Sequence, residues 1–254
     1  MLIAGQTKRI NRGRGHSYVL DGVKVPGVTT LINGGFPKRA LVDWAARTVA
    51  GYAVDTWDEL AELPPSERLR RLERAHIDER DAAAVRGTRV HRLAEPLARG
   101  EEVDVPDELA GHVEACVRFL DQWDVEVIFS ERPVFSRRYR YGGSPDLVAR
   151  LADGRTWLLD WKTNRGGPYG DMAFQLAAYR FAEFYLDESG RERPMPPVDE
   201  CGVVWLRADG YDLYPVEADE HVFRQFLYIA QVSAAAEECR DYIGDALLPP
   251  GGDQ

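Results

Sequence analysis

Three side chains in the middle of the sequence have types and spacing that could perform chemistry. Asp146 opens an apolar segment after a Gly-Gly-Ser-Pro stretch, and Asp160 and Lys162 lie within the apolar run of residues 157–162. A buried carboxylate or ammonium is costly unless another group pairs with it or ligates it. These positions therefore indicate a polar site inside an otherwise apolar part of the fold.

The elements expected around these side chains would bring them together. Residues two apart on a strand face the same way, so Asp160 and Lys162 share a face and Trp161 faces the other side. A turn at residues 152–154 can fold the two strands into a hairpin and bring Asp146 near Asp160. An ordinary hairpin whose Asp160 and Lys162 form salt bridges with other residues is the alternative.

Two carboxylates that approach closely repel each other unless a proton or a cation lies between them. Hard oxygen ligands favour Mg²⁺ or Mn²⁺ over zinc. Lys162, beside such an ion, could orient a water or stabilise the charge that grows on a phosphate in a transition state. The spacing of Asp146, Asp160 and Lys162 is thus compatible with metal-dependent phosphoryl chemistry.

The composition suits a globular protein with one large domain: 254 residues, 44% hydrophobic and 29% charged. No apolar run is long enough for a membrane span, and the first residues lack the features of a secretory signal, so we expect a cytoplasmic protein. The net charge of −10 argues against a general polyanion binder. Three widely spaced cysteines, Cys116, Cys201 and Cys239, indicate buried thiols and no disulfide framework.

The hydrophobic periodicity and the turn signals predict an α/β fold with a central mixed sheet flanked by helices. A hairpin is expected around Asp21-Gly22, and a second one around residues 208–210. Strands are expected within residues 125–139, 142–152 and 156–163. Helices are expected at residues 37–54, 64–79, 79–100, 106–124, 171–188 and 219–243.

The order of several short motifs resembles the PD-(D/E)xK nuclease superfamily, in particular its RecB-like branch of phage and bacterial exonucleases. The matching residues run from Arg86 to Tyr185, and the upstream segment 27–46 also looks like phage-encoded members. The histidine-containing upstream helix of that branch has its counterpart in the segment Gly87–Glu95. The motif residues, in chain order, are His91, Gly142, Pro145, Asp146, Asp160, Trp161, Lys162, Gln175 and Tyr179.

The resemblance implies a restriction-endonuclease-like core over residues 86–246, an N-terminal hairpin and helical cap over residues 1–85, and a flexible tail at 247–254. It also implies a Mg²⁺ or Mn²⁺ ion and DNA, as ends or single strands, as the substrate. Some relatives hold an iron–sulfur cluster with four cysteines; this sequence has three, so no cluster is expected. The second acid is Asp rather than Glu, which the family pattern permits.

The resemblance assigns a role to each matching residue. Asp146, Asp160 and the main-chain carbonyl of Trp161 would bind the metal, with His91 as a further ligand. Lys162 would activate water or steady the scissile phosphate. Gln175 and Tyr179 would line the site or hold the substrate strand, although a hydrogen bond between them within the core explains them equally well.

Several further polar residues lie near these motifs in the sequence. Glu95 is one helical turn after His91 and could orient it or share the ion. Glu131 and the nearby arginines are expected to be scaffold or backbone contacts, and Arg138 and Arg140 are candidates to meet phosphate.

The function expected from these observations is a magnesium-dependent deoxyribonuclease, an exonuclease of recombination, repair or phage replication. A non-catalytic nucleic-acid-binding module on the same fold is one alternative. An endonuclease specific for sequence or structure is another, and nothing in the sequence separates it from an exonuclease.

Overall fold

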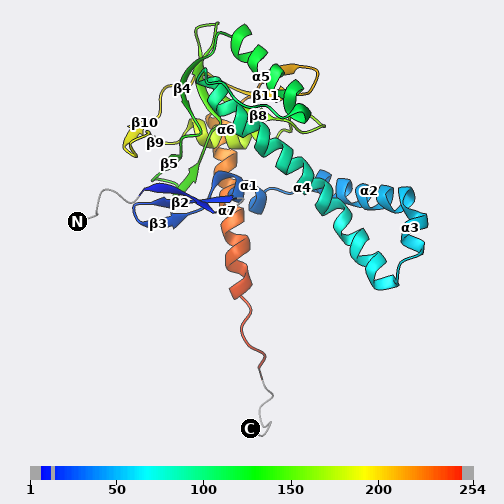
Figure 1. The fold of residues 1–254 in the computed structure, drawn as a ribbon. Helices are drawn as coiled ribbons and strands as arrows, with labels where there is room; N and C mark the ends of the chain where they lie inside the picture. Colours follow the sequence, from blue (N-terminus) through cyan, green and yellow to red (C-terminus); the bar gives the residue numbers. More distant parts are fainter. Residues whose placement is uncertain (1–6, 13–14, 248–254) are drawn as a thin grey trace.

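The computed structural model describes residues 7–12 and 15–247, and a central mixed sheet organises them (Figure 1). Its strand order is β12-β11-β8-β7-β4; β8 and β11 are parallel, and the other neighbours are antiparallel. The strands are β4 (Glu126–Ser130), β7 (Leu147–Arg150), β8 (Thr156–Lys162), β11 (Glu200–Leu206) and β12 (Tyr211–Pro215). The expected α/β class with a central mixed sheet is confirmed.

Helices cover both faces of this sheet, which explains the nearly continuous apolar run of β8. On one face, Leu158 packs into a core built with α1 (Val28–Gly35), α6 (Met172–Arg180) and α7 (Glu220–Glu238). On the other face, Trp161 packs with residues of α4 (Pro65–Ala98) and α5 (Ala110–Gln122). Successive side chains of β8 therefore enter two different cores, and Asp160 shares the face of Leu158.

Two smaller sheets flank the central one. The first contains β1 (Lys8–Arg12), β2 (Gly15–Leu20) and β3 (Val23–Val25). The second has the order β10-β9-β5-β6, with its strands at β5 (Val134–Ser136), β6 (Tyr141–Gly143), β9 (Phe184–Leu186) and β10 (Glu192–Pro194). The expected hairpin around Asp21-Gly22 is confirmed as β2 and β3, and both turn residues have positive φ. The hairpin of β11 and β12 is confirmed as well.

The N-terminal sheet docks onto the segment that leads to Asp146. Gly27 forms a β-bridge with Gly142, and the Gly142 amide donates to the Pro26 carbonyl at 3.0 Å. A Cβ atom on Gly142 would lie 2.6 Å from Cγ and 2.8 Å from Cβ of Tyr18. The absence of a side chain at this glycine is what allows the two sheets to approach so closely.

A helical arm projects from the body of the molecule (Figure 1). It contains α2 (Arg39–Asp55), α3 (Trp57–Ala61) and the first part of α4. The two helices expected at 64–79 and 79–100 form the single helix α4, which also runs through the expected domain boundary at residues 85 and 86. None of the helices in the described part of the chain is long and apolar enough to cross a bilayer.

Two further expectations from the sequence are wrong. The helix expected at 171–188 ends at Arg180, because Phe184 and Leu186 are buried as part of β9, which pairs with β5 and β10. Cys239 is exposed, whereas Cys116 and Cys201 are buried as expected. Of the expected tail, only Leu247 lies within the described residues, and it is exposed.

We predict that Gly142→Ala lowers the free energy of unfolding by about 1–3 kcal/mol, because the new methyl group overlaps the part of Tyr18 nearest its backbone. Gly170→Ala is the matched control, since no atom lies within 4 Å of a Cβ there, and it should change stability by less than about 0.5 kcal/mol. Urea denaturation of the two variants measures the difference. Equal stabilities would contradict the close docking of the N-terminal sheet.

Candidate active site

The register of β7 and β8 places two carboxylates side by side. Leu147 pairs with Leu159 and Val148 with Leu158, and Asp146 lies in the bend directly before this ladder, close enough for its charge to act on Asp160. The amide of Trp161 donates to Asp146 Oδ2 at 2.8 Å, which fixes that carboxylate at the end of the strands.

Asp160 is almost completely buried, with 3% of its surface exposed. Gln175, on α6, donates from Nε2 to Asp160 Oδ1 at 2.7 Å. The other oxygen, Oδ2, is in an ion pair with Lys162 Nζ and receives no hydrogen bond of normal geometry within the described residues. Burial raises the pKa of Asp160, and the negative charge of Asp146 adds to this effect while Lys162 opposes it.

Lys162 is held as a cation. Burial would lower its pKa, but the charges of Asp160 and Asp146 outweigh burial and raise the pKa above its ordinary value. A lysine with a raised pKa stays protonated at neutral pH, so it can stabilise negative charge but cannot accept a proton.

His91 reaches Asp146 from α4, whose neighbouring residues Val90 and Ala94 are buried against the opposite face of the sheet. Its Nδ1 lies 3.5 Å from Asp146 Oδ2. Burial lowers the pKa of His91, but the Asp146 carboxylate prevails and raises it to about 9. In return, His91 lowers the pKa of Asp146 against the effect of burial. Glu95 instead forms a 2.8 Å ion pair with Arg99.

Glu131 belongs to this cluster, although the sequence led us to expect a scaffold or backbone contact there. It follows β4, the neighbour of β7, and its amide donates to the Asp146 carbonyl at 3.2 Å. Burial and the nearby Asp146 charge raise the pKa of the Glu131 carboxyl to about 7. An acidic residue directly after an apolar strand that adjoins the Asp146 strand is the signal that could have identified it.

Glu131 also has a strained backbone. Its φ angle is 53°, in the left-handed region that favours glycine. For a residue with a Cβ atom this conformation costs about 1–2 kcal/mol. Strained residues of this kind gather at functional sites, where the surrounding structure holds them in place.

Three ligand atoms, one each from His91, Glu131 and Asp146, lie within 4.8 Å of one another. In an octahedral site with bonds near 2.1 Å, ligand atoms are about 3–4.2 Å apart, so a small movement of side chains would suffice. Two carboxylates and an imidazole are also a donor set that Mg²⁺ or Mn²⁺ accepts. The half-buried, mutually repelling acids Glu131 and Asp146 therefore fit a divalent cation, with the buried Asp160 beside them.

Tyr179 lies one helical turn after Gln175 and packs on the segment before Asp146. A Cβ atom on Gly143 would lie 2.2 Å from the Tyr179 ring. Burial, with smaller contributions from nearby acidic groups, raises the pKa of Tyr179 well above its ordinary value, so the hydroxyl stays protonated. Gln175 and Tyr179 thus both lie at the site, and the described residues show no hydrogen bond between them.

The structure does not bring the remaining candidates to this cluster. Arg138 and Arg140 lie in the turn between β5 and β6, whereas Glu131 and Asp146 lie beyond the other end of that hairpin. The Arg138 guanidinium stacks over the Tyr139 ring at 5.2 Å. The side chain of Trp161 is buried in the opposite core, so only its main chain faces the site.

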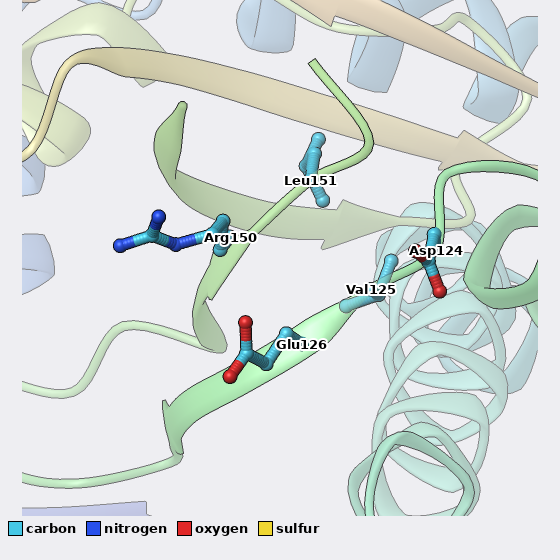
Figure 2. Close-up of a pocket in the computed structure, with 5 residues that line it drawn as sticks. All are labelled: Asp124, Val125, Glu126, Arg150 and Leu151. Carbon is cyan, nitrogen blue, oxygen red and sulfur yellow. The ribbon is translucent and has the colours of Figure 1, made fainter. Parts of the chain in front are cut away.

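A surface cavity of about 410 Å³ lies elsewhere, at the far ends of β4 and β7 (Figure 2). Glu126 and Arg150 contribute to its lining and are paired across these strands, at the end opposite Glu131 and Asp146. This cavity is therefore separate from the carboxylate cluster, which is the part of the molecule where perturbed acids and bases converge.

No protein-family model and no curated protein sequence matches this chain. Among solved structures, LHK-Exo in complex with dAMP is 15% identical over 86% of this chain and 90% of its own, with a TM-score of 0.42. A structure of LHK-Exo, an alkaline exonuclease from Laribacter hongkongensis, is 16% identical over 66% of this chain and 83% of its own, with a TM-score of 0.35. Because both TM-scores are below 0.5, we draw no conclusion from these similarities.

We predict that Glu131→Gly is more stable than Glu131→Ala by about 1 kcal/mol, because only glycine relieves the left-handed backbone. Both variants lose the same carboxylate, so the difference isolates the strain. At Glu126, an exposed position in β4 that lacks the positive φ, the same two substitutions should give the opposite order. Urea denaturation of the four variants tests this; an alanine that is more stable at both positions would rule out the strain at Glu131.

Proposed function

We propose that this chain is a divalent-metal-dependent deoxyribonuclease of the RecB-like PD-(D/E)xK type. One observation carries the proposal: Asp146, held by the Trp161 amide next to the Asp160–Lys162 pair, has His91 and Glu131 within ligand distance. The order of the motifs in the sequence supports the same conclusion. We further propose an exonuclease that acts in recombination, repair or phage replication in the cytoplasm of a bacterial or phage-infected cell.

The carboxylates of Asp146, Asp160 and Glu131, with His91 and the Trp161 carbonyl, would hold the cation, which we propose to be Mg²⁺ or Mn²⁺. When bound, the ion supplies a Lewis acid for the phosphate and a water of lowered pKa. Without a cation the acids cancel the positive charge of their basic neighbours, so the site offers a phosphodiester no net positive charge and DNA binding there should depend on the ion.

The residues of the chain itself position and neutralise the reacting groups. Lys162 carries a charge that can stabilise the negative charge developing on the phosphate. Gln175 fixes the orientation of Asp160 through its 2.7 Å hydrogen bond. Tyr179 presents a protonated hydroxyl group beside the same acids and can donate to substrate oxygen.

The acidic composition agrees with a local rather than a general attraction for DNA. The chain has a net charge of −10, so phosphate must be drawn to a particular place. The cluster provides that place, because a divalent cation added to acids that are already paired with basic side chains would make the site net positive.

We predict that Asp160→Ala and Lys162→Ala each lower the rate of DNA cleavage by at least about 100-fold. The assay follows digestion of end-labelled linear DNA with Mg²⁺, Mn²⁺ or EDTA. Asp209→Ala is the matched control, since this acid is 83% exposed and pairs with Arg207 in the turn between β11 and β12. It should keep full activity, and EDTA should abolish the activity of the wild type.

Equal cleavage by the wild type and both site variants would contradict the catalytic assignment. A folded wild type that binds DNA with Mg²⁺ but does not cleave it would instead indicate the binding module. Closed circular DNA separates the other alternative, because an exonuclease leaves it intact and an endonuclease opens it.

A further inference from the structure

Arg9, on strand β1 of the N-terminal sheet, reaches into the carboxylate cluster from 122 residues away in sequence. Its Nη1 lies 3.3 Å from Glu131 Oε2 and 3.4 Å from the Glu131 carbonyl oxygen. The same nitrogen donates to Ser144 Oγ at 3.0 Å, and the Tyr18 hydroxyl contacts this Oγ at 3.2 Å. The N-terminal sheet therefore contributes a charged side chain directly to the site.

Arg9 completes a set of three ion pairs. Every carboxylate of the cluster has a basic partner, and only Arg9 comes from outside the segment of residues 86–246. This arrangement balances the acids one by one. The pairs are Asp146 with His91, Asp160 with Lys162, and Glu131 with Arg9.

The guanidinium of Arg9 still has free donors. Within the described residues all of its hydrogen bonds use Nη1, which leaves Nε and Nη2 without a protein acceptor. Its side chain is 24% exposed, so these donors can be reached from outside. A guanidinium edge with two adjacent N–H groups is the geometry that binds a phosphate in a bidentate manner.

We propose that Arg9 is a phosphate-binding residue of this site, paired with Glu131 in the metal-free protein and turned toward the substrate once Glu131 ligates a divalent cation. A guanidinium and a divalent ion on one carboxylate repel each other, so Arg9 must give way. The Ser144 hydroxyl remains as its anchor during this change. This inference rests on the proposed function, because the phosphate is that of a DNA strand.

A purely structural Arg9 would behave differently. If it only held Glu131 and the N-terminal sheet in place, its removal would weaken metal binding and DNA binding together. Removal of a residue that competes with the cation and then binds phosphate would have two opposite effects: the metal would bind more tightly and DNA would bind more weakly. The two roles can therefore be separated without any measurement of cleavage.

The experiment compares the wild type with Arg9→Gln, Arg9→Lys and Arg137→Gln. Arg137 is the matched control, because it anchors the same N-terminal sheet through a 3.0 Å ion pair with Asp21 and does not contact Glu131. Calorimetric titration with Mn²⁺ alone gives the metal affinity. Fluorescence anisotropy of a labelled oligonucleotide, with Ca²⁺ at several salt concentrations, gives the DNA affinity and its salt dependence.

We expect Arg9→Gln to bind Mn²⁺ at least about 3-fold more tightly, because a competing positive charge is gone. It should bind the oligonucleotide about 10-fold more weakly, and the slope of log K against log salt should fall by about one. Arg9→Lys should keep the metal affinity and salt slope of the wild type and lose part of the DNA affinity, since its charge remains without the planar fork. Arg137→Gln should match the wild type in both titrations.

Weaker Mn²⁺ binding by Arg9→Gln, or an unchanged salt slope, would overturn the inference. If the wild type binds DNA without cleaving it, the proposed nuclease activity is refuted, but the salt dependence of DNA binding still tests the role of Arg9. If the wild type cleaves DNA but Arg9→Gln shows the same salt dependence of DNA binding as the wild type, only the role proposed for Arg9 is refuted. If the wild type binds no DNA, both proposals fail.

Discussion

Like-charge repulsion among three carboxylates at one end of the central sheet is the constraint on which the rest of the site depends. Asp146, Asp160 and Glu131 come from three adjacent strands of that sheet or from the residues next to them. At short range and away from water such charges cannot all persist without compensation. His91, Lys162 and Arg9 provide it, and each comes from a different element.

The surrounding structure maintains this crowding at a cost in stability. Glu131 keeps a left-handed backbone, and Gly142 and Gly143 allow two aromatic rings to press against the chain just before Asp146. The strained backbone of Glu131 lowers stability without a visible gain in packing, and natural proteins retain such strain mainly at sites with a function. Apolar residues at these positions would avoid the repulsion but could not bind a metal. Because the acids are kept and paired with basic side chains, their carboxylates remain available for a cation.

The sequence predicts the centre of the site well because the relevant signals are local. The apolar run of residues 157–162 and the turn at 152–154 are enough to place the Asp160 strand beside the segment that begins at Asp146. Arg9 and strand β9 are set by pairings between segments far apart in the chain, which periodicity cannot detect. The same limit explains why the segment after Arg180 was expected to remain helical: Phe184 becomes a strand residue only because β5 lies beside it.

The central claim, that these acids hold a divalent cation, is tested most directly by anomalous diffraction from crystals of the protein grown with Mn²⁺. The account predicts a strong anomalous peak about 2.1 Å from oxygens of Asp146 and of at least one of Asp160 and Glu131. It also predicts that the Arg9 guanidinium has moved away from Glu131. A cluster without a peak at saturating Mn²⁺, with all three ion pairs intact, would contradict it.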